Sequence, residues 1–121
     1  MIPEIQNKIF LIAEAGINHN GKIKNAINLV KMAKKSGADA IKFQTYNTER
    51  RVRTNNPAFN ILKKCELTYK EFSEIKNYCD DKKILFFSTP FDLEAVDFLE
   101  SLKVKLYKVA SFDISNFDLI N

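Results

Sequence analysis

The sequence has few of the residues that mark unusual classes of protein. Its 121 residues include two cysteines, three glycines, three prolines, one histidine and no tryptophan. So little glycine and proline excludes a linker-rich or disordered chain. Cys65 and Cys79 match no metal-binding or redox spacing and are too few for a disulfide framework, so we expect a reducing, cytoplasmic setting. With His19 as its only histidine, the chain is not expected to build a histidine-based metal site.

Long apolar runs and strong charge are also missing. No stretch of about 18 apolar residues occurs, so no membrane span is predicted. The N-terminal stretch lacks the basic region of a secretion signal. Lys and Arg number 19 against 15 Asp and Glu, and the net charge of +4 is spread along the chain. This mild excess does not indicate a nucleic-acid partner, but it suits a small anionic substrate.

Four short apolar runs, each rich in β-branched or aromatic residues, alternate with amphipathic stretches. Runs of this length that end at Gly, Pro, Asn or Asp are typical of buried strands. The four strands are predicted at residues 9–16, 40–46, 84–91 and 106–114.

Helical spacing occupies the stretches between these runs. Apolar residues at helical intervals predict a helix over residues 23–33, which Gly37 then ends. Thr68 and Glu71 fit a capping box at the start of a second helix. Asp92 is placed to cap a third. A shorter helix is expected around residues 59–65, and the polar insert at residues 47–59 is expected to be irregular.

The resulting order, strand–helix repeated to a fourth strand, implies an α/β fold with parallel strands and right-handed crossovers. An open doubly wound sheet and a closed (β/α)8 barrel both use it. Polar residues within the strands favour the barrel, whose active sites lie at the carboxyl ends of its strands. Because such a barrel takes typically about 250 residues, residues 1–121 are expected to form its N-terminal half, or about four β/α units.

Polar side chains gather where the strands should end. In a barrel these ends converge on one pocket. The period of two along a strand places Lys42 and Gln44 toward that pocket and Ile41 and Phe43 toward the helices. His19 is expected to form hydrogen bonds within its own turn. The candidate pocket residues are Glu14, Lys42, Gln44, Ser88, Thr89, Lys108, Ser111 and Asp113.

Each of these residues also has an ordinary structural explanation, such as a solvated strand-end lysine or a helix cap. Taken together, two lysines, hydroxyl groups and a carboxylate at successive strand ends match an anion pocket beside an acid or base. Lysines and hydroxyls bind phosphate, and a carboxylate within an apolar strand is costly unless it is paired. We therefore expect a phosphorylated or carboxylated substrate.

The motifs AEAGINHNG, IKFQTY, FFSTPFD and YKVASFD, in this order, resemble the N-terminal half of the N-acetylneuraminate (sialic acid) synthase family. That family includes legionaminate, pseudaminate and spore-coat polysaccharide synthases. The resemblance implies condensation of phosphoenolpyruvate with an N-acetylated hexose, such as N-acetylmannosamine, to give a nonulosonic acid and phosphate. It also implies a (β/α)8 barrel followed by an antifreeze-like domain that residues 1–121 lack, and a homodimer.

The same resemblance implies roles for individual residues. Glu14 would be the catalytic carboxylate near C2 of phosphoenolpyruvate. The residues expected to bind substrates are Lys42, Gln44, Thr89, Phe91, Lys108, Ser111 and Asp113. Of these, Gln44 and Asp113 are implied as contacts to the sugar. A divalent metal, Mn²⁺ or Mg²⁺, is expected in the complete enzyme, with no ligand in this chain.

Two other functions remain open from the residues. Lys42 or Lys108 would be the nucleophile of a Schiff-base aldolase. Alternatively, the chain is a truncated barrel fragment that folds, or binds an anion weakly, without turnover. In either case the first and fourth predicted strands would leave apolar edges, which invite pairing with a second chain. The sequence leaves open the identity of the sugar acceptor.

Overall fold

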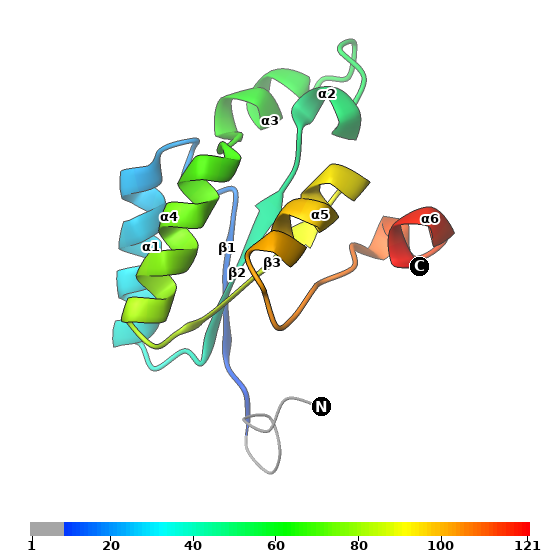
Figure 1. The fold of residues 1–121 in the computed structure, drawn as a ribbon. Helices are drawn as coiled ribbons and strands as arrows, with labels where there is room; N and C mark the ends of the chain where they lie inside the picture. The colour runs from blue at the N-terminus through cyan, green and yellow to red at the C-terminus, as the bar shows by residue number, and fades with distance from the viewer. Residues whose placement is uncertain (1–8) are drawn as a thin grey trace.

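A computed structural model describes residues 9–121, which form a parallel sheet with helices packed against it (Figure 1). The strands are β1 Ile12–Gly16, β2 Ala40–Thr45 and β3 Leu85–Pro90. The helices are α1 Ile23–Lys35, α2 Thr48–Arg51, α3 Phe59–Cys65, α4 Tyr69–Asp81, α5 Leu93–Ser101 and α6 Phe117–Ile120. The predicted alternation of strand and helix is confirmed through α5.

The sheet has the order β1-β2-β3, with both pairs parallel. Parallel neighbours need a crossover connection, which α1 supplies between the first two strands and α4 supplies between the next two. Figure 1 shows α1 and α4 side by side on one side of the sheet. The carboxyl ends of all three strands therefore lie at the same edge.

The core lies between the sheet and these helices. Ile41 and Phe43 in β2 are fully buried, and the Phe43 ring meets Phe72 of α4 edge-on at 6.3 Å and stacks on Phe86 at 5.7 Å. Lys42 and Gln44 alternate with them and lie on the opposite face of the strand. The predicted alternation is thus confirmed, and it places the polar side chains of β2 on the face that the helices leave free.

Both helix starts predicted from sequence are confirmed. At α4 the Glu71 backbone N–H donates to Thr68 Oγ1 at 3.2 Å, and the Thr68 N–H donates to Glu71 Oε2 at 2.8 Å. This capping box satisfies two N–H groups that the helix itself leaves unpaired. At α5 the Ala95 N–H donates to Asp92 Oδ1 at 2.8 Å.

The predicted fourth strand at residues 106–114 is wrong. Among the described residues this segment forms one bridge, between Tyr107 and Ser88, with the Lys108 N–H donating to the Ser88 carbonyl at 3.2 Å. The chain then turns into a 3₁₀ helix at Ser111–Asp113. The Asp113 N–H donates to the Ala110 carbonyl, so local turn bonds replace the ladder in this segment.

The polar insert after β2 is also more ordered than expected. Residues Thr48–Arg51 form α2, whose first turn is capped by the Asn47 side chain accepting from the Arg50 N–H at 3.3 Å. A short polar helix has weak intrinsic stability, so its presence depends on contacts with the rest of the fold. The shorter helix predicted around residues 59–65 is confirmed as α3.

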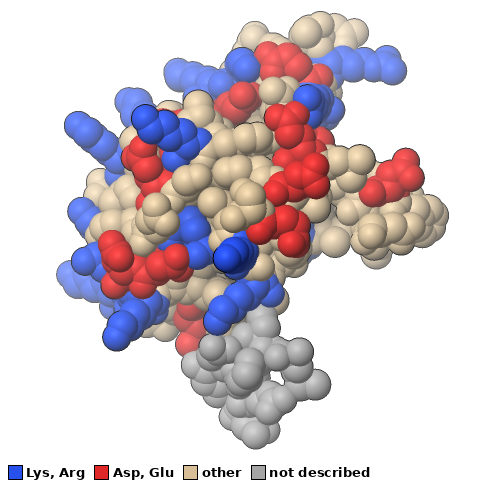
Figure 2. Space-filling view, in the orientation of Figure 1, with Lys and Arg blue, Asp and Glu red and all other residues tan. Residues whose placement is uncertain are grey.

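Charged side chains of both signs are mixed over the face with α1 and α4, and acidic ones gather along α5 (Figure 2). Exposed apolar side chains are grouped mainly at the start of β1 and in the segment after α5. The first group is Ile9, Leu11 and Ile12, and the second is Tyr107, Val109, Phe112, Ile114, Phe117 and Ile120. Met32, Ile61 and Leu93 are exposed singly on helices. Among residues 9–121, no helix has the length and hydropathy needed to cross a membrane.

Candidate functional site

An ion pair joins the middle of β1 to the middle of β2. Glu14 and Lys42 are register partners, and Lys42 Nζ lies 2.8 Å from Glu14 Oε2. The Lys42 side chain is mostly buried at 13% exposed, whereas Glu14 is 56% exposed. The pair therefore presents its carboxylate to the open side and keeps its ammonium against the sheet. Such a partly desolvated lysine is a fixed positive charge for an anionic ligand.

Gln44 and Thr89 extend this polar row toward β3. They are register partners, and Thr89 is buried. The pairing of β1 with β2 shifts by one residue between Glu14 and Gly16, which is the irregularity of a β-bulge. As a result, a methyl group placed at Gly16 would lie 3.7 Å from Glu14 Oε1 and 3.9 Å from Gln44 Nε2. The carboxylate and the amide thus border the same small space.

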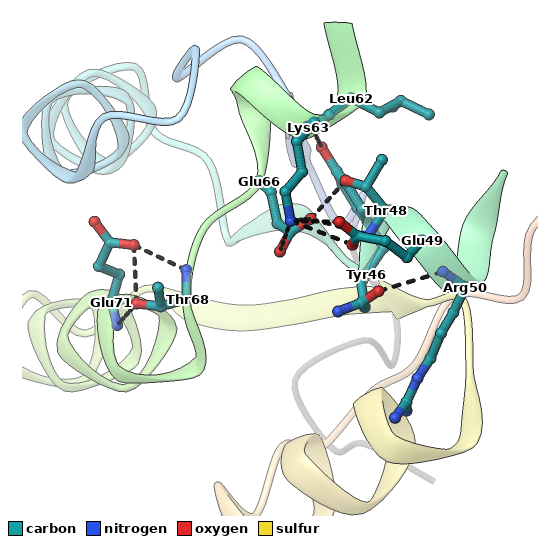
Figure 3. Close-up of polar contacts among 10 residues, drawn as sticks. Tyr46, Thr48, Glu49, Arg50, Leu62, Lys63, Glu66, Thr68 and Glu71 are labelled. Carbon is teal, nitrogen blue, oxygen red and sulfur yellow. Dashed lines mark hydrogen bonds and ion pairs between the residues drawn. The ribbon is translucent and has the colours of Figure 1, made fainter. Parts of the chain in front are cut away.

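The insert after β2 is held over these strand ends by a partly buried acid, Glu66. Glu66 Oε2 accepts hydrogen bonds from the backbone N–H and the hydroxyl of Thr48, at 2.9 and 2.5 Å (Figure 3). Lys63 bridges Glu66 and Glu49, and the Tyr46 hydroxyl donates to the Leu62 carbonyl at 2.8 Å. Because Thr48 is fully buried and begins α2, these contacts attach α2 to α3 and the start of α4.

Arg51, at the end of α2, reaches from this framework to the strand ends. Its guanidinium lies 3.8 Å from the ring centre of Phe91 and 4.7 Å from that of Tyr46. The Nη1 atom donates to Gln44 Oε1 at 3.2 Å. Burial lowers the pKa of the Arg51 guanidinium, while Tyr46 and the negative charge of Asp113 act in the opposite direction. Arginine remains protonated in proteins, so this is a permanent charge.

Sequence reasoning missed Arg51, because it lies in the insert that was expected to be irregular. The sequence does contain a pattern that could have indicated its role. Arg51 follows Gln44 by seven residues, and two aromatic residues, Tyr46 and Phe91, stand directly at the ends of predicted strands. Arginine prefers to stack on such rings when it is partly buried.

Of the three site residues predicted in the segment after α5, Asp113 lies near Arg51, whereas Lys108 and Ser111 are exposed. Asp113 is buried, and its Oδ2 atom has no hydrogen-bond partner among the described residues. Phe112 stacks on Phe91 at 5.9 Å, which brings this segment beside the arginine. Ser111 is exposed, and Lys108 is exposed with its ammonium donating to the neighbouring Val109 carbonyl. Because the fourth strand is not formed, Lys108 does not join the Glu14–Lys42 pair.

Two further side chains are explained by local structure. His19 is 1% exposed, and its Nδ1 atom accepts from the Gly21 N–H at 3.1 Å, as expected for a turn histidine. Ser88 lies on the helix side of β3 and shares a 2.8 Å hydrogen bond with Thr45. Within residues 9–121, no three His, Cys, Asp or Glu side chains are grouped to hold a metal ion, so these residues do not fit a metal centre by themselves.

This arrangement can hold an anion on Lys42, place a carboxylate beside it, and bind a polar ligand at Gln44 and Asp113. Residues 29–121 match the model of the NeuB family. The chain belongs to the NeuB family. The NeuB match begins within α1 and includes every site residue named above except Glu14 and His19.

Relatives of this NeuB chain include synthases of sialic-type acids. It is 36% identical to an N,N'-diacetyllegionaminic acid synthase of Campylobacter jejuni over 90% of its own length. It is 46% identical to the uncharacterized protein MJ1065 of Methanocaldococcus jannaschii over 92% of its length. Among solved structures, the sialic acid synthetase of Leptospira borgpetersenii, in complex with citrate, matches 94% of the chain with a TM-score of 0.90 and 43% identity.

The chain spans only part of these proteins. It covers 37% of the Campylobacter synthase, 33% of the Methanocaldococcus protein and 40% of the Leptospira structure. The fold of residues 9–121 is therefore that of the N-terminal part of NeuB synthases, a mixed α/β fold with a parallel sheet.

Proposed function

We propose that the protein containing this chain condenses phosphoenolpyruvate with an N-acetylated hexose, such as N-acetylmannosamine, to give a nonulosonic acid and phosphate. The observation that supports this most is the Glu14–Lys42 pair at 2.8 Å, which joins two neighbouring parallel strands. It combines a fixed cation for a phosphorylated, carboxylated substrate with a carboxylate beside the reacting carbon. The relatives that are synthases of sialic-type acids support the same reaction.

In the proposed reaction, C3 of phosphoenolpyruvate forms a bond to the aldehyde carbon of the open-chain sugar. The double bond supplies the electron pair, so positive charge develops at C2. Water adds at C2, and the phosphate leaves from the same carbon, which becomes the ketone. Lys42 and Thr89 hold the anion in place, and Glu14 stabilises the charge at C2 or removes the proton from the water.

The remaining elements of the proposal lie beyond residues 9–121. We propose that residues 1–121 supply the first part of a (β/α)8 barrel, whose interior is the face bearing Lys42 and Gln44. The exposed apolar side chains of β1 and of the segment after α5 lie where further strands would pack. The divalent metal that the family resemblance implies would take its ligands from other residues, and a homodimer is expected.

The test is an assay of the intact protein with phosphoenolpyruvate, N-acetylmannosamine and related N-acetylated hexoses, in Mn²⁺ or Mg²⁺. We expect phosphate release that needs both substrates, with a nine-carbon acid identified by mass spectrometry in equal amount. Phosphate release without sugar, or no product with any N-acetylated hexose, would contradict the proposal.

A Schiff-base aldolase is distinguished by trapping. Lys42 is paired with Glu14, and Lys108 is exposed and outside that pair, so neither stands alone in an apolar pocket as a Schiff-base lysine would. Borohydride added during turnover with pyruvate would attach a substrate fragment to lysine in an aldolase, and no such mass increase is expected for the synthase.

A further inference from the structure

The position of Arg51 determines which way the Gln44 amide points. Arginine carries only hydrogen-bond donors, so the atom of Gln44 that faces it must be the carbonyl oxygen. The Arg51–Oε1 distance is 3.2 Å. The amide nitrogen of Gln44 is then turned away from Arg51, to the side of Gly16 and Glu14. Gln44 therefore presents its N–H donors to the site, although an unrestrained glutamine could present either its N–H groups or its carbonyl oxygen.

Arg51 is itself held firmly enough to impose this orientation. The central carbon of its guanidinium lies 3.8 Å from the Phe91 ring centre and 4.7 Å from the Tyr46 ring centre, and these two rings meet edge-on at 6.2 Å. The Tyr46 hydroxyl is bonded to the Leu62 carbonyl, so this wall is anchored to α3. Cation–π contact with both rings restricts where the guanidinium can lie and so favours the direction of its donor toward Gln44.

Asp113 adds an unused acceptor to the same region. It is 8% exposed, its Oδ2 atom has no partner among the described residues, and Oδ1 has only a 3.5 Å contact with the Asn116 amide. A buried carboxylate oxygen without a donor is costly, so a bound ligand that donates there would be favoured. Phe112, the neighbour of Asp113 in the chain, stacks on Phe91, and the Arg51 guanidinium lies over the same Phe91 ring, so Asp113 belongs to the same region as Arg51.

We propose that Arg51 is a positioning residue for the sugar acceptor: it orients the Gln44 amide as a donor to an oxygen of the sugar, beside Asp113 as an acceptor for a sugar hydroxyl or amide N–H. This inference rests on the proposed function for the identity of the ligand.

The first test compares Arg51→Met, Arg51→Lys and the control Arg53→Met in the intact protein, since Arg53 is exposed in the same insert. Arg51→Met keeps the apolar stem but removes the donors. We expect the KM for the sugar to rise roughly ten-fold or more, the KM for phosphoenolpyruvate to stay within about two-fold, and Arg51→Lys to fall between. The control should match wild type. Equal changes in both KM values, or none in the sugar KM, would overturn the inference.

A double variant separates positioning from direct binding. If Arg51 acts through Gln44, Arg51→Met combined with Gln44→Ala should bind the sugar no more weakly than Gln44→Ala alone. Additive losses would show that Arg51 acts on its own and would refute the positioning role.

A binding experiment tests the role of Arg51 without depending on turnover. The side-chain amide signal of Gln44, assigned from its loss in Gln44→Ala, is followed by proton–nitrogen NMR while N-acetylmannosamine is added without phosphoenolpyruvate. The inference is supported if the Gln44 amide signal shifts in wild type and the same shift in Arg51→Met needs a much higher sugar concentration. This result would stand even if turnover fails and the proposed reaction is wrong. An amide signal that does not respond in wild type would overturn it.

Discussion

Glu14 and Lys42 stand directly opposite each other in adjacent parallel strands, with their charged atoms 2.8 Å apart. The lysine is mostly buried and the carboxylate is more than half exposed. A ligand anion approaching Lys42 therefore meets Glu14 as well, which places the carboxylate beside whatever the lysine binds. This separation of a binding cation from an accessible carboxylate is the basis of the first prediction.

Glu14→Gln should lower turnover far more than substrate binding. The amide keeps the shape of the side chain and removes the charge that the proposed reaction uses at C2. We expect kcat to fall by roughly 10²–10⁴-fold, with the KM for phosphoenolpyruvate little changed. Glu74→Gln, at an exposed position on α4, is the matched control and should keep wild-type kinetics. Near-normal kcat in Glu14→Gln would refute the catalytic role.

Gly21→Ala should destabilise the turn between β1 and α1. Gly21 has a φ of +67°, and a Cβ atom there would lie 2.1 Å from the Lys64 carbonyl oxygen. Left-handed strain and this clash together should cost about 2–5 kcal/mol in free energy of unfolding. Gly37→Ala is the control: its φ is +81° but nothing lies within 4 Å, so only the strain of about 1–2 kcal/mol remains. Urea denaturation of both variants measures the difference, and equal losses would contradict the clash.

Thr48→Val should loosen the insert that carries Arg51. Valine keeps the shape of threonine but removes the hydroxyl that donates to Glu66. Loss of this partly buried hydrogen bond to a carboxylate should reduce the free energy of unfolding by about 1–2 kcal/mol. Thr54→Val, at an exposed position of the same insert, should leave the urea midpoint unchanged. If the two variants behaved alike, Glu66 would not be what holds α2 in place.

The stability of the protein should fall as the pH drops below about 6.5, the ordinary pKa of histidine. Burial lowers the pKa of His19 in the folded state, and a backbone hydrogen bond at Gly16 and the charge of Glu71 oppose this only in part. Between the folded and unfolded pKa values the unfolded chain binds a proton that the folded chain does not, so unfolding is favoured there. Above pH 6.5 both states are neutral at this residue and the effect vanishes.

Urea midpoints at pH 7.5, 6.5 and 5.5 measure this dependence. His19 is the only histidine among the 121 residues, so its replacement by glutamine should remove most of the change within this range. An equally steep fall in His19→Gln would assign the effect to other groups.

Local pattern was sufficient for much of the fold. The alternation in β2 separates Ile41 and Phe43 from Lys42 and Gln44 because a strand places successive side chains on opposite faces. The Thr68–Glu71 box and the Asp92 cap are confirmed because each depends on residues three apart along the chain. The turn role of His19 follows from the same kind of local bonding.

What sequence alone determined is therefore the parallel α/β order, the face on which Lys42 and Gln44 lie, and the family. Only the tertiary structure decided that residues 106–114 form a single bridge, because a strand needs a ladder partner that local pattern does not reveal. It also decided the place of Arg51, since α2 is held by Glu66, 18 residues from Thr48 along the chain. Contacts between such distant residues depend on how the elements pack, and no short-range period carries that information.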